Sequence, residues 1–299
     1  MRKRKMNKRS LIIGMGIGQL YKTVLEKLGH DIITVDQDPK KGAMYTSVDQ
    51  AIIVHKTFDT AHICTPNFTH FDIASKVAPY SKIVFVEKPG VANSFAWQRL
   101  IEEFKYTRFM MVKNNMWRSN ITELKESAIK AKTVKIKWIR KNCIPNPGSW
   151  FTTKKLAFGG VSRDLMPHLL SLYIAMNPLW RADKIKGNTT LAAWRLEDID
   201  STDYGVVNPK GTYDVDDVCV IDFANKWSCA ANWRSMVDDD SSIEFFMEDN
   251  SVDRFELGWC PEEAYQDMIK EAVDRVDDAK FWADQYEQDT WIHGIIEKL

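Results

Sequence analysis

The chain lacks a net charge and any long hydrophobic run. Its 299 residues include 41 basic and 41 acidic side chains, so no overall field would draw it to nucleic acid or to an anionic membrane. No apolar run of about 18 residues occurs, and none follows the basic residues 1–9 (MRKRKMNKR), so we expect neither a membrane span nor a signal peptide. We expect residues 1–9 to form a solvated tail. These absences predict a cytoplasmic protein with no nucleic-acid or membrane partner.

Cysteine is sparse and scattered. The five cysteines include no C-x-x-C pair and have no histidine at metal-ligand spacing, and most stand in apolar segments. The acidic run 238–240 lacks the regular oxygen-ligand spacing of a calcium loop. We therefore predict reduced thiols and no metal site. The cysteines are Cys64, Cys143, Cys219, Cys229 and Cys260.

Short apolar runs alternate with helical patterns in the first part of the chain. Such alternation predicts a parallel sheet with helices on both faces, and buried parallel strands read as continuously apolar. The runs are residues 10–14, 31–36, 60–65, 82–86 and 109–113.

The pattern changes after residue 118. Residues 133–139 (TVKIKWI) alternate apolar and polar side chains, which indicates a half-solvated antiparallel strand. Two hairpins are predicted further on, in residues 215–233 and 242–257, with one helix at 160–176 and a helical stretch at 261–299. We predict an α/β protein with two domains, residues 1–118 around the parallel sheet and residues 119–299 as an α+β domain with an open, mainly antiparallel sheet.

A glycine-rich turn, GMGIGQLY, joins the first strand to the first helix. Gly14, Gly16, Ile17 and Gly18 would let the backbone approach a pyrophosphate at the helix N-terminus. Asp36 ends the next strand, 20 residues after Gly16, where its carboxylate would accept the ribose hydroxyls of NAD and repel the 2′-phosphate of NADP. The spacing is one residue tighter than G-x-G-x-x-G. The alternative is a tight turn without a ligand.

Two neighbouring strands end in polar residues at the carboxyl edge of the predicted sheet. The first delivers Thr65, Pro66 and Asn67, with His70 opening the next helix, and the second ends in Glu87 and Lys88 before a proline. Ligands of open α/β sheets bind at this edge. We therefore predict that this whole set contacts the cofactor and that Lys88 also reaches a substrate oxygen.

A third motif follows the glycine pair 159–160. Asp164 and His168 stand four residues apart, so a continuous helix would place them on one face. The alternative is that Asp164 caps the helix and His168 is a satisfied core residue. Pro167 would leave the carbonyl of Arg163 without its helical partner.

The C-T-P-N, H, E-K-P and D-x-x-x-H motifs resemble those of the glucose–fructose oxidoreductase/inositol dehydrogenase/MocA (Gfo/Idh/MocA) family. The resemblance covers the whole chain in layout and is sharpest in residues 10–95 and 158–173. It implies an NAD(P)-binding Rossmann domain, and a second domain whose sheet lies behind the pocket and often forms an oligomer interface. The reaction implied is hydride transfer to or from a secondary alcohol or ketone carbon of a sugar, cyclitol or sugar derivative.

The resemblance also implies roles for three residues. His168 would exchange the hydroxyl proton, Lys88 would stabilise the developing oxyanion, and Asp164 would orient one of them. Two alternatives stay open: an imine- or bilin-type C=N or C=C reductase, and a cofactor-binding sensor without catalysis. The presence of both Lys88 and His168 favours alcohol chemistry.

The remaining expectations rest on position. Four residues near the domain junction or a nearby loop are candidates for substrate contact, namely Asn115, Trp117, Arg118 and Trp150. A homodimer or homotetramer is expected to bury a face of the second sheet, with Trp194 and Trp233 as candidate exposed aromatics. His30, His55, His62 and His293 stand in no chemical motif, and we interpret them as ordinary.

Overall fold

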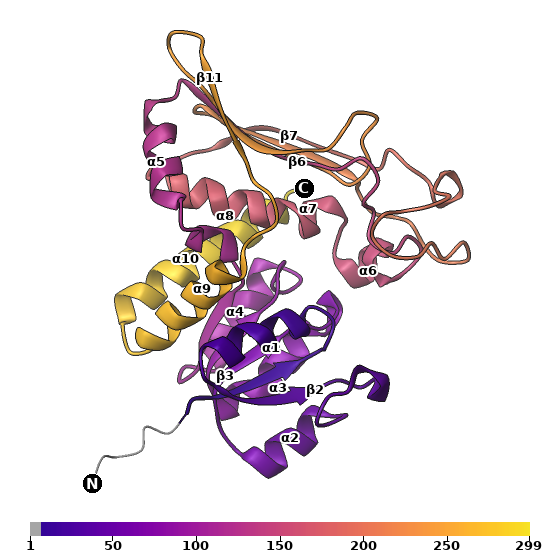
Figure 1. Cartoon of the computed structure of the whole chain (residues 1–299), viewed down its shortest axis with the longest axis vertical. Helices are drawn as coiled ribbons and strands as arrows, with labels where there is room; N and C mark the ends of the chain where they lie inside the picture. The colour runs from indigo at the N-terminus through magenta and orange to yellow at the C-terminus, as the bar shows by residue number, and fades with distance from the viewer. Residues whose placement is uncertain (1–6) are drawn as a thin grey trace. The chain divides into compact units, whose positions relative to one another are not determined.

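The computed structural model describes residues 7–299, so most of the predicted N-terminal tail lies outside the described residues. The chain forms two compact units (Figure 1). The first contains the described residues up to Val112 together with Pro261–His293, and the second contains Lys113–Cys260 and Gly294–Leu299. No helix among the described residues is long and apolar enough to cross a membrane.

A five-stranded parallel sheet forms the centre of the first unit, in the order β2-β1-β3-β4-β5. A single parallel bridge, Val35 to Tyr45, extends the sheet beyond β2. The strands are β1 (Arg9–Ile13), β2 (Asp31–Val35), β3 (Phe58–Ile63), β4 (Ser81–Val86) and β5 (Arg108–Met111). The helices are α1 (Gly18–Lys27), α2 (Val48–His55), α3 (His70–Val77), α4 (Ser94–Glu103), α9 (Glu262–Asp274) and α10 (Ala279–Ile296).

The core of this unit lies on both faces of the sheet, as the continuously apolar strands predict. Residues 83–86 of β4 and 109–111 of β5 are almost fully buried. Helix α1 buries Tyr21, Val24 and Leu25, and Trp97 of α4 is fully buried beside Phe109. The parallel α/β prediction for this half is confirmed.

The division of the chain differs from the predicted boundary at residue 118, because α9 and residues 279–293 of α10 belong to the first unit. The backbone N–H of Met111 donates to Asp289 Oδ2 (3.0 Å), and Arg108 Nε donates to the carbonyl of Val276 (3.3 Å). An amphipathic pattern predicts a helix but not the surface on which its apolar face packs. The sequence alone therefore did not show that Pro261–His293 belongs to the first unit.

The second unit is built on a six-stranded sheet of order β11-β10-β6-β9-β8-β7. All neighbouring strands are antiparallel except β6 and β9, which are parallel. The strands are β6 (Thr133–Ile139), β7 (Ile185–Leu191), β8 (Val218–Phe223), β9 (Trp227–Asn232), β10 (Asp240–Phe246) and β11 (Val252–Glu256). The helices are α5 (Ile121–Lys130), α6 (Lys154–Ala157), α7 (Val161–Asp164) and α8 (Met166–Met176).

Alternation along β6 decides which face of this sheet is the core. Val134, Ile136 and Trp138 are buried, with Lys135 and Lys137 on the other face. The apolar helix α8 packs against β6 and β9 (Figure 1). The half-solvated strand, both hairpins and the mainly antiparallel sheet are confirmed; β6 is antiparallel to β10 and parallel to β9.

Two further sequence expectations need correction. The single helix expected at 160–176 is divided at Leu165 into α7 and α8, because Pro167 has no N–H for the carbonyl of Arg163. Trp233, expected to be an exposed aromatic, is 1% exposed. The other candidate, Trp194, is partly covered, with the Arg234 guanidinium 4.5 Å from its ring centroid.

Candidate functional site

The glycine turn lies at the point where the order of the parallel strands reverses. Strand β1 has β2 on one side and β3 on the other. At such a reversal, open parallel sheets usually have their ligand crevice, outside the carboxyl ends of the strands. Gly14 has φ +90°, and a Cβ on it would lie 2.5 Å from the carbonyl oxygen of Cys64. Glycine is therefore required where the loops after β1 and β3 meet.

The other two glycines of the turn have different functions. A Cβ on Gly18 would lie 2.9 Å from Ile12 Cγ2, so Gly18 permits close packing of α1 on β1. Gly16 instead faces open space, with no described atom within 4 Å of its Cβ position. Helix α1 begins after Ile17, a hydrocarbon side chain that caps none of its N–H groups. The turn thus presents a bare helix N-terminus beside an unfilled backbone surface, which suits a pyrophosphate.

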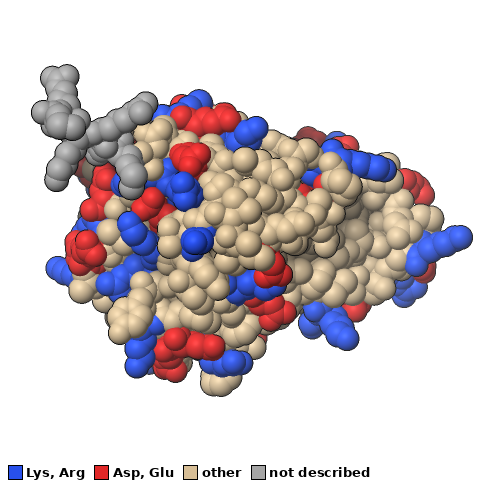
Figure 2. Space-filling view, turned by 90° about the horizontal axis from the view of Figure 1, so that it is seen from below, with Lys and Arg blue, Asp and Glu red and all other residues tan. Residues whose placement is uncertain are grey.

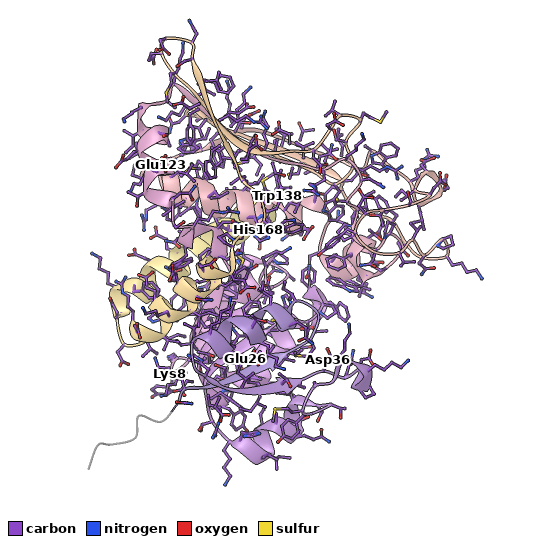
Figure 3. All side chains as sticks on the ribbon, in the orientation of Figure 1. Lys8, Glu26, Asp36, Glu123, Trp138 and His168 are labelled. Carbon is purple, nitrogen blue, oxygen red and sulfur yellow. The ribbon has the colours of Figure 1, made fainter. Side chains whose placement is uncertain are left out.

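Asp36 connects the end of β2 to this turn (Figure 3). Its Oδ2 accepts the N–H of Met15 (2.7 Å), and its Oδ1 accepts the N–H of Asp38 (2.9 Å). These two bonds fix the carboxylate, and each oxygen keeps a lone pair for a further donor. Ribose hydroxyls are such donors. The residues of this crevice therefore fit the adenosine and pyrophosphate parts of a dinucleotide.

The turn that carries Lys88 is fixed by contacts of the residues before and after it. Before it, the side chain of Glu87 accepts the hydroxyl of Tyr21 (2.6 Å, Oε1) and the N–H of Lys88 (3.1 Å, Oε2). After it, the peptide to Pro89 is cis, and the carbonyl of Gly90 lies 2.6 Å from His70 Nδ1. Burial, with a smaller contribution from the charge of Glu87, raises the pKa of Tyr21 well above its usual value, so Tyr21 acts as a neutral donor.

His70, one of the predicted cofactor contacts, lies at the start of α3. Its side chain is fully buried, and its Nε2 lies 2.8 Å from the carbonyl of Thr65 while its Nδ1 faces Gly90. Both ring nitrogens therefore lie beside backbone carbonyls, and a neutral imidazole, which has one N–H, donates to one of them. Burial lowers the pKa of the imidazole. His70 thus lies between the loop after β3 and the turn that carries Lys88.

Thr65, Pro66 and Asn67 stand in the loop after β3, as predicted, and all three are partly exposed. The hydroxyl of Thr69 lies 2.7 Å from Thr65 Oγ1 and holds the loop in a tight turn. The structure thus brings together the glycine turn, Asp36 and the ends of β3 and β4 at one edge of the first sheet.

In the second unit, Asp216 fixes the segment that carries Asp164. Its carboxylate accepts the N–H groups of Gly160 and Ser162 (2.8 Å each), and its carbonyl accepts the N–H of Val161 (2.9 Å). A Cβ on Gly160 would lie 1.7 Å from that carbonyl oxygen, which explains the glycine. Asp164 itself accepts Trp233 Nε1–H at Oδ2 (2.9 Å). No local sequence signal pointed to Asp216, which lies 56 residues from Gly160.

His168 is partly exposed and belongs to a polar chain inside the second unit. Asn115 Nδ2 lies 3.2 Å from its Nδ1, and Asn115 Oδ1 accepts Arg118 Nε–H (2.8 Å). The ring of Trp138 covers His168, with 5.6 Å between the ring centroids (Figure 3). The alternation of β6 already predicted that Trp138 faces the core side.

The other residues predicted to contact substrate are placed as follows. Asn115 is fully buried and Arg118 is 7% exposed, and Arg118 also donates to the carbonyls of Leu257 and Gly258. Trp117 is partly exposed at the end of a 3-10 turn, and Trp150 stacks on Phe151 with 3.9 Å between the ring centroids. Among residues 7–299, no three His, Cys, Asp or Glu side chains are grouped so that they could hold a metal ion.

Comparison with known proteins defines the class to which this site belongs. Residues 33–113 match the family model described as an oxidoreductase family with an NAD-binding Rossmann fold, GFO_IDH_MocA. A protein of Amycolatopsis mediterranei assigned as a UDP-kanosamine synthase oxidoreductase subunit is 24% identical over 218 residues, which is 65% of this chain and 61% of that relative.

Solved structures share the fold over nearly the whole chain. GenD2 from gentamicin A biosynthesis, in complex with NAD, superposes with a TM-score of 0.74 at 18% identity, covering 99% of this chain and 94% of GenD2. Levoglucosan dehydrogenase, in complex with NADH and levoglucosan, gives a TM-score of 0.71 at 17% identity, covering 98% and 97%.

The fold and the crevice define a Rossmann-type dinucleotide-binding domain joined to an α+β unit. Within that class, the segment 33–113 matches the model of the Gfo/Idh/MocA oxidoreductase family. The family resemblance and the NAD-binding Rossmann domain predicted from the sequence motifs are thereby confirmed.

Proposed function

We propose that this protein is an NAD-dependent dehydrogenase or reductase acting on a secondary alcohol or ketone carbon of a sugar, cyclitol or sugar derivative. The observation that carries the proposal is the crevice at the carboxyl edge of the first sheet. There an open glycine turn, an uncapped helix N-terminus and the fixed carboxylate of Asp36 lie together. The names of the relatives, which include a sugar dehydrogenase and a nucleotide-sugar synthase subunit, support the substrate class.

The nicotinamide, when bound, accepts or supplies the hydride. The protein would supply position and charge through Lys88, Asp164 and His168. The ammonium group of Lys88 would stabilise negative charge on the substrate oxygen, and its turn is fixed for this by Glu87 and His70. Asp164, restrained by Trp233, would orient His168 or Lys88.

The experiment has two parts. Fluorescence titration is expected to give tighter binding of NADH than of NADPH, because the Asp36 carboxylate repels a 2′-phosphate. Asp36→Asn keeps the size of the side chain and removes its charge, so it should narrow the preference for NADH over NADPH. Asp49→Asn makes the same change at an exposed carboxylate of α2 and serves as the control. Tighter binding of NADPH by the wild-type protein would contradict the cofactor assignment.

The second part is a panel of substrates. Hexoses, cyclitols, nucleotide sugars and imines are incubated with NAD⁺ or NADH while absorbance at the nicotinamide band is followed. Turnover of a secondary alcohol or ketone supports the proposal. Turnover of imines alone would identify a C=N reductase, and cofactor binding without any turnover would identify a sensor.

A further inference from the structure

We propose that Asn115, held by Arg118, is a positioning residue that fixes His168 as a neutral imidazole with its proton on Nε2. The assignment begins with Arg118. Its Nε–H can only donate, so the Asn115 atom 2.8 Å away is the amide oxygen. The other two guanidinium nitrogens donate to the carbonyls of Leu257 (2.7 Å) and Gly258 (3.2 Å), which prevents the guanidinium from turning.

The orientation of the amide then decides the state of the histidine. With its oxygen toward Arg118, Asn115 presents Nδ2 to His168 Nδ1 at 3.2 Å. An amide nitrogen donates and does not accept, so Nδ1 must be the acceptor and carry no proton. A doubly protonated ring would set an N–H group against the NH₂ group of Asn115. Asn115 is fully buried, so water does not relieve that conflict.

This arrangement changes the role of His168 within the proposed function, on which the inference rests. A neutral ring protonated on Nε2 donates a hydrogen bond from Nε2 and cannot take a proton there. In ketone reduction, the carbonyl carbon would receive the hydride that a bound nicotinamide supplies, and the oxygen would take its proton from the ammonium group of Lys88, which is left as a neutral amine; alcohol oxidation is the reverse. His168 thus donates to the substrate oxygen, whereas the family resemblance implies that it exchanges the proton.

The first test needs neither cofactor nor substrate. Long-range ¹H–¹⁵N spectra of the full chain, labelled at its six histidines, distinguish protonated from unprotonated ring nitrogens, and loss of one signal set in His168→Gln identifies His168. We expect Nδ1 unprotonated and Nε2 protonated at about pH 7.5, one unit above the ordinary pKa of histidine. A wild-type spectrum with the proton on Nδ1, or a doubly protonated ring, overturns the proposal without any variant.

Asn115→Asp tests the cause. It keeps the shape of the side chain and the partner for Arg118 but places a carboxylate acceptor beside Nδ1, so the proton should move to Nδ1. Asn120→Asp introduces the same charge at the N-terminus of α5, where it is tolerated, and should leave the His168 spectrum unchanged. An unchanged spectrum in Asn115→Asp overturns the proposal.

Kinetics on any substrate that the panel identifies give an independent readout. Asn115→Asp should lower kcat by about 10²–10³-fold, the usual cost of losing one donor to a developing oxyanion. His168→Gln retains a donor but cannot exchange a proton, so it should keep at least about tenfold more turnover than His168→Leu. Equal losses in the two variants overturn the donor role. If the spectra are as expected but the panel shows no turnover, the proposed function fails while the assignment of Asn115 stands.

Discussion

The imidazole of His293 occupies the space into which any side chain on Gly90 would project. A Cβ on Gly90, which has φ +82°, would lie 2.5 Å from His293 Nε2. The same nitrogen accepts the N–H of Val91 (3.2 Å), and His293 Nδ1 donates to the carbonyl of Asp289 (2.7 Å). His293, which stands in no recognisable sequence motif, therefore holds the turn that carries Lys88 from its far side.

We predict that Gly90→Ala lowers the free energy of unfolding by about 1–3 kcal/mol, the usual cost of forcing extra atoms into a packed site. Gly29→Ala is the matched control, because Gly29 has φ +73° but no described atom within 4 Å of its Cβ position. Gly29→Ala introduces the same kind of backbone strain but no close contact, so it should lower the free energy of unfolding by less than Gly90→Ala does. Urea denaturation measures both, and equal losses would contradict the contact.

A double-mutant cycle tests the same pair more directly. His293→Ala removes the ring that the methyl group introduced by Gly90→Ala would meet, so the double variant should lose less stability than the sum of the two single losses. If the two losses in free energy of unfolding simply add, the methyl group introduced by Gly90→Ala does not clash with the His293 ring.

Lys88→Ala should lower turnover by about 10²–10⁴-fold while leaving NAD affinity nearly unchanged. Loss of an oxyanion donor typically costs about 10²–10³-fold in rate, and loss of an acid or base about 10²–10⁴-fold. Lys82→Ala, at an exposed lysine in β4 that pairs with Asp59, is the control. Steady-state kinetics and NADH titration measure the two effects, and near wild-type turnover by Lys88→Ala would remove Lys88 from the catalytic set.

Stability should fall as the pH is lowered from about 6.5. Burial lowers the pKa of His62 to about 3, and its ring stacks on Phe85 with 4.8 Å between the centroids. Because the unfolded chain binds this proton at higher pH than the folded one, the loss approaches about 1.4 kcal/mol for each pH unit between those two values.

His62→Leu should flatten this dependence, as measured by urea midpoints at about pH 7, 5 and 4, which span the window between the two pKa values. His55→Leu removes a partly exposed imidazole at the end of α2 and is the control. An unchanged pH dependence in His62→Leu would show that other groups cause the acid sensitivity.

A homodimer or homotetramer remains a prediction, with a revised surface. The solvent-side residue Lys137 of β6 pairs with Asp240 and Glu244, and Arg254 pairs with both of these carboxylates. Figure 2 draws a different face of the molecule, on which basic and acidic side chains are likewise interspersed. An interface on the solvent-side face of the second sheet would therefore be largely polar. Light scattering that gives only the 34.5 kDa monomer at micromolar concentration would contradict the prediction.

The parts of the fold that were predicted correctly depend on local signals. Continuous apolar strands and the glycine spacing indicated the parallel sheet and placed Asp36 at the end of β2. The alternation of β6 indicated its buried face. Even the break in the D-x-x-x-H helix had a local signal in Pro167.

The missed features join residues far apart in the chain. Asp216 fixes the glycine pair from 56 residues away, and His293 reaches Val91 across 202 residues. Asn115 and Arg118 were selected for their position, but the sequence does not say that Arg118 turns inward to the carbonyls of Leu257 and Gly258. The direction in which a buried polar side chain points depends on which buried polar groups of the folded chain need a hydrogen-bond partner.

The return of α9 and α10 to the first unit has a consequence for synthesis of the protein. A ribosome completes the five parallel strands by Met111 but supplies the segment that holds β5 and the Lys88 turn only at Pro261–His293. The nucleotide-binding unit therefore stays incomplete while Lys113–Cys260 of the second unit are made. A frameshift or premature stop near residue 260 would leave every predicted catalytic residue in place and still deprive the dinucleotide crevice of its support.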